Sequence, residues 1–175
     1  MQPLRVLIAE DETIIRLDLR ALLEDHGFVV CGEARDGVEA VDLARELEPD
    51  VILVDVKMPR LDGIEAARRI YAERPVTIVA LTAFGDRELV ERAVGAGVFA
   101  YLVKPFREHD VAAAIRAAAA RHEELIAARR EVGAQPPPAP VELMVHSSAG
   151  NSWPLRLGRM PDGSLDVSIT RERDA

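Results

Sequence analysis

Short apolar runs alternate with helix-like segments along the first three quarters of the chain, and this alternation limits the fold more than any other feature. Most runs are rich in Val, Ile and Leu with little polar alternation, which is typical of strands buried on both faces of a sheet. Between them, apolar residues recur at intervals of three and four positions, as on one face of a helix. The repeats predict a doubly wound α/β domain, with right-handed crossovers and a parallel sheet covered by helices on both faces. The runs are Leu4–Ala9, Val29–Ala34, Val51–Asp55, Val76–Thr82 and Ala100–Lys104.

The chain changes composition near Gly133. Six of the 11 prolines lie beyond that point, four of them within residues 136–140, and such a run favours the extended polyproline II geometry of a linker. We predict a main domain over residues 1–132, a Pro-rich linker over 133–140 and a short appendage over 141–175. About 40 residues with few large apolar side chains make a marginal domain, so we expect the appendage to be hairpin-like or disordered. Its candidate strands are Val141–His146, Trp153–Leu157 and Leu165–Thr170.

The composition excludes several classes of protein. A net charge of −8 and 4% aromatic residues argue against a broad nucleic-acid or anionic-membrane surface. Cys31 is the single cysteine, which excludes an intramolecular disulfide and a cysteine-built metal site. No apolar run approaches the roughly 18 residues of a membrane span, and the first ten residues lack a signal-peptide layout. We expect a cytoplasmic protein that does not bind membranes.

Chemically capable side chains stand where the predicted strands end. Glu10 and Asp11 follow the first strand, Asp55 ends the third, Thr82 ends the fourth and Lys104 ends the fifth. In doubly wound folds, ligands bind outside the carboxyl ends of the strands, so these groups should converge there. Three neighbouring carboxylates repel one another and favour a bound cation, and oxygen ligands at a half-open site suit Mg²⁺.

This arrangement suits attack by a carboxylate on a phosphoryl group. Asp55 would be the nucleophile, while Mg²⁺ and Lys104 would balance the charge on the phosphoryl oxygens. Each residue alone has an ordinary structural explanation: Asp11 could cap the helix that opens near Thr13, and Lys104 could be a solvated surface residue. The placement of five such residues at four strand ends favours the chemical interpretation.

The ordered set of motifs resembles the receiver domain of bacterial two-component response regulators, over about residues 4–124. The fold of that family is flavodoxin-like, with the five parallel strands in the order 2-1-3-4-5. The motifs that carry the resemblance are Glu10-Asp11, Val54-Asp55-Val56-Lys57-Met58-Pro59, Asp62-Gly63, Leu81-Thr82-Ala83 and Tyr101-Leu102-Val103-Lys104-Pro105-Phe106.

The resemblance implies a role for each matching residue. Asp55 would accept the phosphoryl group from the phosphohistidine of a sensor histidine kinase, with Lys104 binding the phosphoryl oxygens. Thr82 and Tyr101 would form the switch pair, in which Thr82 moves toward the phosphate and the Tyr101 ring turns inward. The Mg²⁺ ligands would be Glu10, Asp11, Asp55 and the backbone carbonyl of Lys57. The peptide bond that precedes Pro105 would be cis.

The resemblance also implies a phospho-accepting regulator rather than an enzyme, apart from self-catalysed phosphotransfer and autodephosphorylation. The signal would change a face formed by residues 86–96 and 101–120, which a downstream protein or a second copy of the chain would read. A stripe on the last helix is a candidate dimer seam, although packing of its first half on the sheet fits the same pattern. The stripe consists of Val111, Ile115, Ala118, His122 and Leu125.

Two alternatives remain open. The segments 55–70 and 81–106 resemble receivers of actinobacterial regulators that carry an RNA-binding antitermination module called ANTAR, which favours a regulator of transcription that binds RNA or DNA. The acidic charge and the missing helical module oppose this alternative. A hydrolytic Mg²⁺ enzyme with an aspartyl nucleophile is the other, and it fits poorly because such enzymes usually carry a second acid at the position that Lys57 occupies here.

Overall fold

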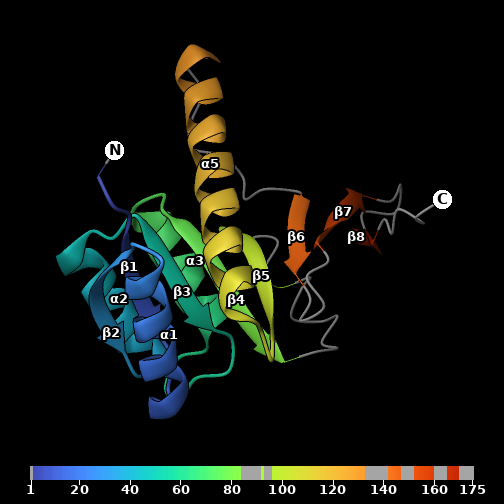
Figure 1. Cartoon of the computed structure of the whole chain (residues 1–175). Coiled ribbons are helices and arrows are strands. Elements are labelled where there is room, and N and C mark those ends of the chain that lie inside the picture. The colour runs from blue at the N-terminus through green and yellow to red at the C-terminus, as the bar shows by residue number, and fades with distance from the viewer. Residues whose placement is uncertain are drawn as a thin grey trace.

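The computed structural model describes residues 2–83, 92, 96–132, 142–146, 152–159 and 165–169. In this part of the chain, strands and helices alternate as the sequence predicts, and the strands form one sheet (Figure 1). The helical pattern expected between the fourth and fifth strands lies outside the described residues, except for Arg92, which is helical. The first five strands are β1 (Arg5–Ala9), β2 (Val29–Ala34), β3 (Val51–Asp55), β4 (Thr77–Ala83) and β5 (Val98–Lys104), and the helices are α1 (Thr13–Asp25), α2 (Gly37–Leu47), α3 (Gly63–Glu73) and α5 (Glu108–Val132).

These five strands lie in the order β2-β1-β3-β4-β5, and every neighbouring pair among them is parallel. The predicted doubly wound fold with strand order 2-1-3-4-5 is therefore confirmed. Each crossover from one strand to the next passes through a helix or through the segment between β4 and β5. This connectivity places the carboxyl ends of β1, β3, β4 and β5 at the same edge of the sheet.

Three further strands extend the sheet beyond the expected five. They are β6 (Glu142–His146), β7 (Ser152–Arg159) and β8 (Leu165–Ile169), close to the strands predicted for the appendage. β6 pairs with β5 in parallel, while β7 and β8 follow in antiparallel order (Figure 1). The predicted linker, residues 133–140, lies outside the described residues, so the division of the chain into domains stays a prediction.

Apolar side chains form a core on each face of the sheet. One core joins the sheet to α2 and α3, and the other joins it to α1 and α5. Along β1, Leu7 belongs to the first core, whereas Val6 and Ile8 belong to the second, as the alternation of side chains along a strand requires. Burial on both faces explains why the sequence of these strands shows little polar alternation.

The candidate dimer seam on α5 is wrong for most of its length. Val111, Ile115, Ala118 and His122 are all buried, and the three apolar ones belong to the core between α5 and the sheet. The partly buried Leu125 packs against the same core. This stripe therefore holds α5 on its own sheet and is not available to a second copy of the chain.

His122 fixes the second half of α5 near the start of β4. Its Nδ1 lies 3.0 Å from the hydroxyl of Thr77, and its ring centroid lies 4.5 Å from that of Phe99. Its Nε2 is buried and has no hydrogen-bond partner among the described residues. Burial, followed by the positive charge of Arg74, lowers the pKa of His122 below its ordinary value of 6.5. The folded protein therefore favours the neutral imidazole.

We predict that His122 makes the fold less stable in mild acid. Because its pKa is lower in the folded than in the unfolded chain, the contribution is complete above pH 6.5 and is lost as the pH falls toward the lowered pKa. Urea unfolding of the wild type and of His122→Gln between pH 7.5 and 5.5 measures this effect. The free energy of unfolding should fall more steeply with decreasing pH in the wild type, and equal slopes would contradict the prediction.

Candidate functional site at the carboxyl ends of the strands

The strand register brings the predicted residues to one place. Asp55 at the end of β3 is aligned with Leu81 of β4, and Leu81 is aligned with Leu102 of β5. Thr82 and Lys104 therefore extend one and two residues beyond the level of Asp55. Glu10 and Asp11 come directly after β1, which lies beside β3.

Three carboxylates form the centre of the site. One oxygen from each of Glu10, Asp11 and Asp55 lies within 4.8 Å of the other two. Glu10 has no exposed surface, Asp55 is 7% exposed and Asp11 is exposed, so the cluster opens toward solvent on one side. An open cluster of hard oxygen donors fits Mg²⁺, which binds through one or two carboxylates and keeps several positions for water or phosphate oxygens.

Lys104 is the cation paired with two of these acids. Its Nζ lies 2.7 Å from an oxygen of Glu10 and 3.1 Å from an oxygen of Asp55. Burial raises the pKa of both carboxyls even though Lys104 opposes the shift. Burial acts against the charge on Lys104, but its two ion pairs prevail and raise its pKa. One lysine therefore does not balance the buried acids fully, and a further cation would be favoured here.

Thr82 and Tyr101 lie on the same face of the sheet. Ala80 is aligned with Tyr101 and shares a core with it, and Thr82 follows Ala80 by two residues. The Tyr101 ring is 2% exposed, so it points into the protein, and its hydroxyl has no hydrogen-bond partner among the described residues. Burial raises its pKa. A buried hydroxyl without a partner costs on the order of 1–3 kcal/mol.

The two remaining predicted residues flank this centre. Lys57 is exposed and lies two residues after Asp55, in the loop that leads to α3. The peptide bond between Lys104 and Pro105 is cis.

The start of α3 packs directly against the backbone of Asp55. Asp62 caps the helix by accepting a hydrogen bond from the N–H of Glu65 at 2.9 Å, and the N–H of Gly63 donates to the carbonyl of Val56 at 3.0 Å. A Cβ atom at position 63 would overlap the carbonyl oxygen of Asp55. The sequence presents Asp62-Gly63 only as one of the motifs that carry the family resemblance, and the close packing of the glycine is not visible in it.

Arg16 is a second residue that the sequence did not reveal. It is only 8% exposed, although it is a charged residue on a helix, and its guanidinium donates to the carbonyl of Glu10 at 2.7 Å. Its position four residues after Glu12 reads as an ordinary polar position of an amphipathic helix, so spacing alone carried no signal for it.

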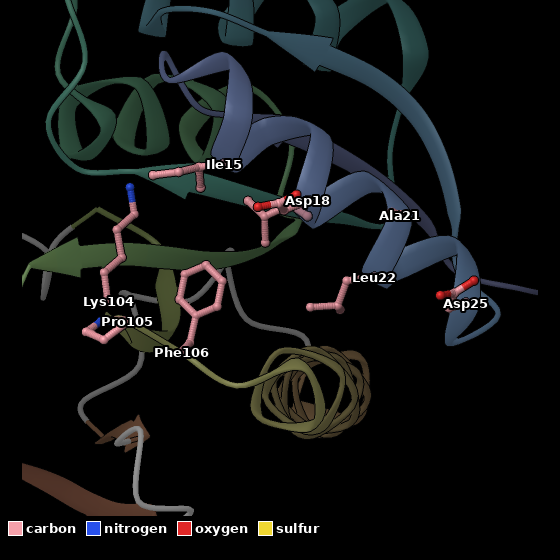
Figure 2. Close-up of a pocket in the computed structure, with 9 residues that line it drawn as sticks. Ile15, Asp18, Ala21, Leu22, Asp25, Lys104, Pro105 and Phe106 are labelled. Atoms are coloured by element: carbon pink, nitrogen blue, oxygen red, sulfur yellow. The ribbon is translucent and has the colours of Figure 1, made fainter.

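A groove of about 730 Å³ runs beside the site, between α1 and the segment that follows β5 (Figure 2). Ile15 and Leu22 line it from α1, Phe106 lines it from the opposite side, and Lys104 reaches it near the carboxylates. Two apolar residues on α1, Ile14 and Leu17, are 75% and 55% exposed. They lie one turn before Asp18 and Ala21, two residues that also line the groove. An apolar strip of α1 therefore extends from the groove toward the start of the helix.

Residues 6–116 match the family model described as the response regulator receiver domain. The chain belongs to this family. It is 54% identical over 130 residues to the transcriptional regulatory protein PdtaR of Mycobacterium tuberculosis, which covers 74% of this chain. The chain spans 63% of the length of PdtaR, less than two thirds.

Solved receiver structures have the same fold. A signal receiver domain of a modulated diguanylate cyclase from Desulfovibrio desulfuricans matches with a TM-score of 0.66 and 35% identity, over 70% of this chain and 98% of that one. The receiver domain of a sensor histidine kinase from Pseudomonas aeruginosa matches with a TM-score of 0.62 and 32% identity, over 67% and 98%. That structure has a magnesium ion coordinated in its active-site cleft.

The chain therefore contains a receiver domain of the kind found in two-component response regulators. Among its described residues, no helix is both long and apolar enough to cross a membrane.

Proposed function

We propose that this receiver accepts a phosphoryl group on Asp55 from the phosphohistidine of a sensor histidine kinase. The observation that carries the proposal is the position of Lys104, which contacts Asp55 and Glu10 within a cluster of three carboxylates. Of the two carboxylates that Lys104 contacts, Asp55 keeps some exposed surface, whereas Glu10 is completely buried. A phosphoryl donor can therefore reach Asp55.

The transfer exchanges one bond for another. A carboxylate oxygen of Asp55 forms a bond to phosphorus while the bond from phosphorus to the imidazole nitrogen of the kinase breaks. The nitrogen keeps the electron pair of that bond, and because the other ring nitrogen carries a proton, the ring leaves as neutral imidazole. Lys104, already within 3.1 Å of Asp55, stays protonated and holds the phosphoryl oxygens as their charge is redistributed.

Glu10, Asp11, Asp55 and the backbone carbonyl of Lys57 would hold Mg²⁺. When bound, the ion supplies positive charge that screens the carboxylates from one another and from the incoming phosphoryl oxygens. The family match and the oxygen-donor cluster support this assignment.

The new phosphate adds about −1.5 to −2 charges beside the end of β4. Thr82 would then move toward the phosphoryl oxygens and hydrogen-bond them. The Tyr101 ring, which the switch-pair prediction turns inward, is already buried on the same face of the sheet and would keep that position. Residues 86–96 and 101–120 would present this change to a downstream protein or to a second copy of the chain.

The kinase would bind at the groove beside α1. The groove reaches Lys104, so a partner seated there would bring its phosphohistidine to the site, and the exposed side chains of Ile14 and Leu17 would extend the apolar contact. This surface combines contact with Lys104, which pairs with Asp55, and exposed apolar side chains.

A second candidate function is regulation of transcription through nucleic-acid binding. The 54% identity to a transcriptional regulatory protein supports it, although the chain spans only 63% of that relative. Both functions start from the same phosphoryl transfer, and they differ in what reads the signal.

The phosphoryl-transfer proposal is tested by incubation with Mg²⁺ and acetyl phosphate, followed by intact mass spectrometry. The wild type should gain the mass of one phosphoryl group, and Asp55→Asn should not. Omission of Mg²⁺ should abolish or strongly slow the labelling. Absence of labelling under conditions that label another receiver, or equal labelling of Asp55→Asn, would refute the proposal.

The groove is tested by Ile14→Asp. A charge in the apolar strip should slow transfer from a histidine kinase that phosphorylates the wild type by roughly tenfold, because each 1.4 kcal/mol of lost contact energy is a factor of ten. Labelling by acetyl phosphate, which needs no docking surface, should be unchanged and serves as the control. An unchanged rate of transfer from the kinase would show that it docks elsewhere.

The nucleic-acid alternative is tested by titrating RNA and DNA with the phosphorylated protein at several salt concentrations. Binding that weakens as salt increases, and that depends on phosphorylation, would favour this alternative. From the charge of −8 we expect no such binding by this chain.

A further inference from the structure

We propose that Arg16 is a positioning residue, which fixes the loop carrying Glu10 and Asp11 and thereby sets the affinity of the site for Mg²⁺. The inference rests on the proposed function, because it assumes that these acids bind the ion. It concerns a residue that would not touch the ion itself.

Arg16 binds the backbone of both acidic residues. Its Nη1 donates to the carbonyl oxygen of Glu10 at 2.7 Å and lies 3.4 Å from that of Asp11. Among the described residues, Arg16 contacts neither carboxylate; the oxygens of Glu10 instead accept from the N–H of Glu12 at 3.3 Å and from Lys104 at 2.7 Å. A single guanidinium therefore restrains two consecutive peptide units, and with them the directions in which the carboxylates leave the chain.

The loop lacks the usual means of support at the start of a helix. Glu12 is the N-cap residue of α1, and its side chain makes no capping hydrogen bond. Such bonds commonly hold the first turn of a helix to the residues before it. Arg16 compensates from one turn further along, because its side chain reaches back to the carbonyl of Glu10.

Glu33 on β2 holds Arg16 in this position. One carboxylate oxygen of Glu33 accepts from Nε of Arg16 at 3.2 Å, and the other accepts from Arg20 at 2.7 Å. The neighbouring residue of β2, Ala34, accepts the backbone N–H of Glu10 at 3.0 Å. The backbone of Glu10 is thus bonded directly to β2. Arg16 adds an indirect link, because it contacts both Glu10 and Glu33.

The effect of Arg16 on the ion has two opposing parts. Its positive charge alone would repel Mg²⁺, so its removal could strengthen binding. Glu33 balances that charge in a short ion pair, which leaves the restraint on the loop as the larger effect. Residues that orient metal ligands from behind typically change the affinity by about 10–100-fold when they are removed.

The test is a Mg²⁺ titration of the full chain in the absence of any phosphoryl donor. NMR or calorimetry measures the dissociation constant. Arg16→Gln should raise the dissociation constant by about tenfold or more. The double variant Arg16→Gln with Glu33→Gln removes both charges of the pair, so the net charge is unchanged, and it should show the same loss. Arg20→Gln is the matched control, because it also breaks an ion pair with Glu33 but leaves the loop untouched, and its affinity should equal that of the wild type.

Wild-type affinity in the double variant, or an equal loss in Arg20→Gln, would overturn the proposal. Arg16→Lys should recover part of the affinity, because an ammonium can donate to the carbonyl of Glu10 but cannot hold Glu33 at the same time with the geometry of the guanidinium. Should Arg16→Gln fail to fold, amide exchange of residues 10–13 in Glu33→Gln without Mg²⁺ decides instead, since release of Arg16 should speed that exchange and an unbalanced charge alone should not.

Amide hydrogen exchange without Mg²⁺ separates this inference from the proposed function. The amides of residues 10–13 should exchange faster in Arg16→Gln than in Arg20→Gln, and equal exchange would refute the loop restraint. A wild-type chain that binds no Mg²⁺ would contradict the proposed cofactor and the effect on affinity, whereas the exchange result would still decide whether Arg16 fixes the loop.

Discussion

Charge balance at the carboxyl ends of the strands is the constraint on which this structure depends. Glu10 and Asp55 are buried side by side, and burial raises the pKa of both, while Lys104 pairs with each of them. Removing one member of a buried ion pair leaves an uncompensated charge, which is strongly destabilising. The site therefore depends on a balance of buried charges, and the proposed phosphoryl transfer would use the same charges.

The sequence predicted the parts of the site that follow from topology. Glu10, Asp55 and Lys104 each stand at the end of an apolar run, and the parallel order of the strands brings such ends together. Arg16 and Gly63 escaped prediction because their roles depend on neighbours brought close by folding. Arg16 is held in its buried position by Glu33, which is 17 residues away in the chain. Gly63 packs against the carbonyl of Asp55, which leaves no room for a side chain.

Two features at the far end of the chain illustrate a different limit. The spacing of apolar residues on α5 suits either a seam between two helices or packing on a sheet, and the burial of Val111 and Ile115 decides for the sheet. The sequence of residues 141–170 predicted strands but could not show their neighbour. In the structure, β6 pairs with Ala100–Leu102 of β5, the part of that strand that contains Tyr101.

The close packing of Gly63 limits where the proposed phosphorylation could cause movement. Because the first turn of α3 rests on the carbonyl of Asp55 and its N–H binds the carbonyl of Val56, the backbone at the end of β3 is supported from behind. A phosphoryl group on Asp55 would then have to be accommodated by its other neighbours. Under the proposed function, the end of β3 would be the fixed side of the switch, and displacement would fall on β4 and β5, which carry Thr82 and Tyr101.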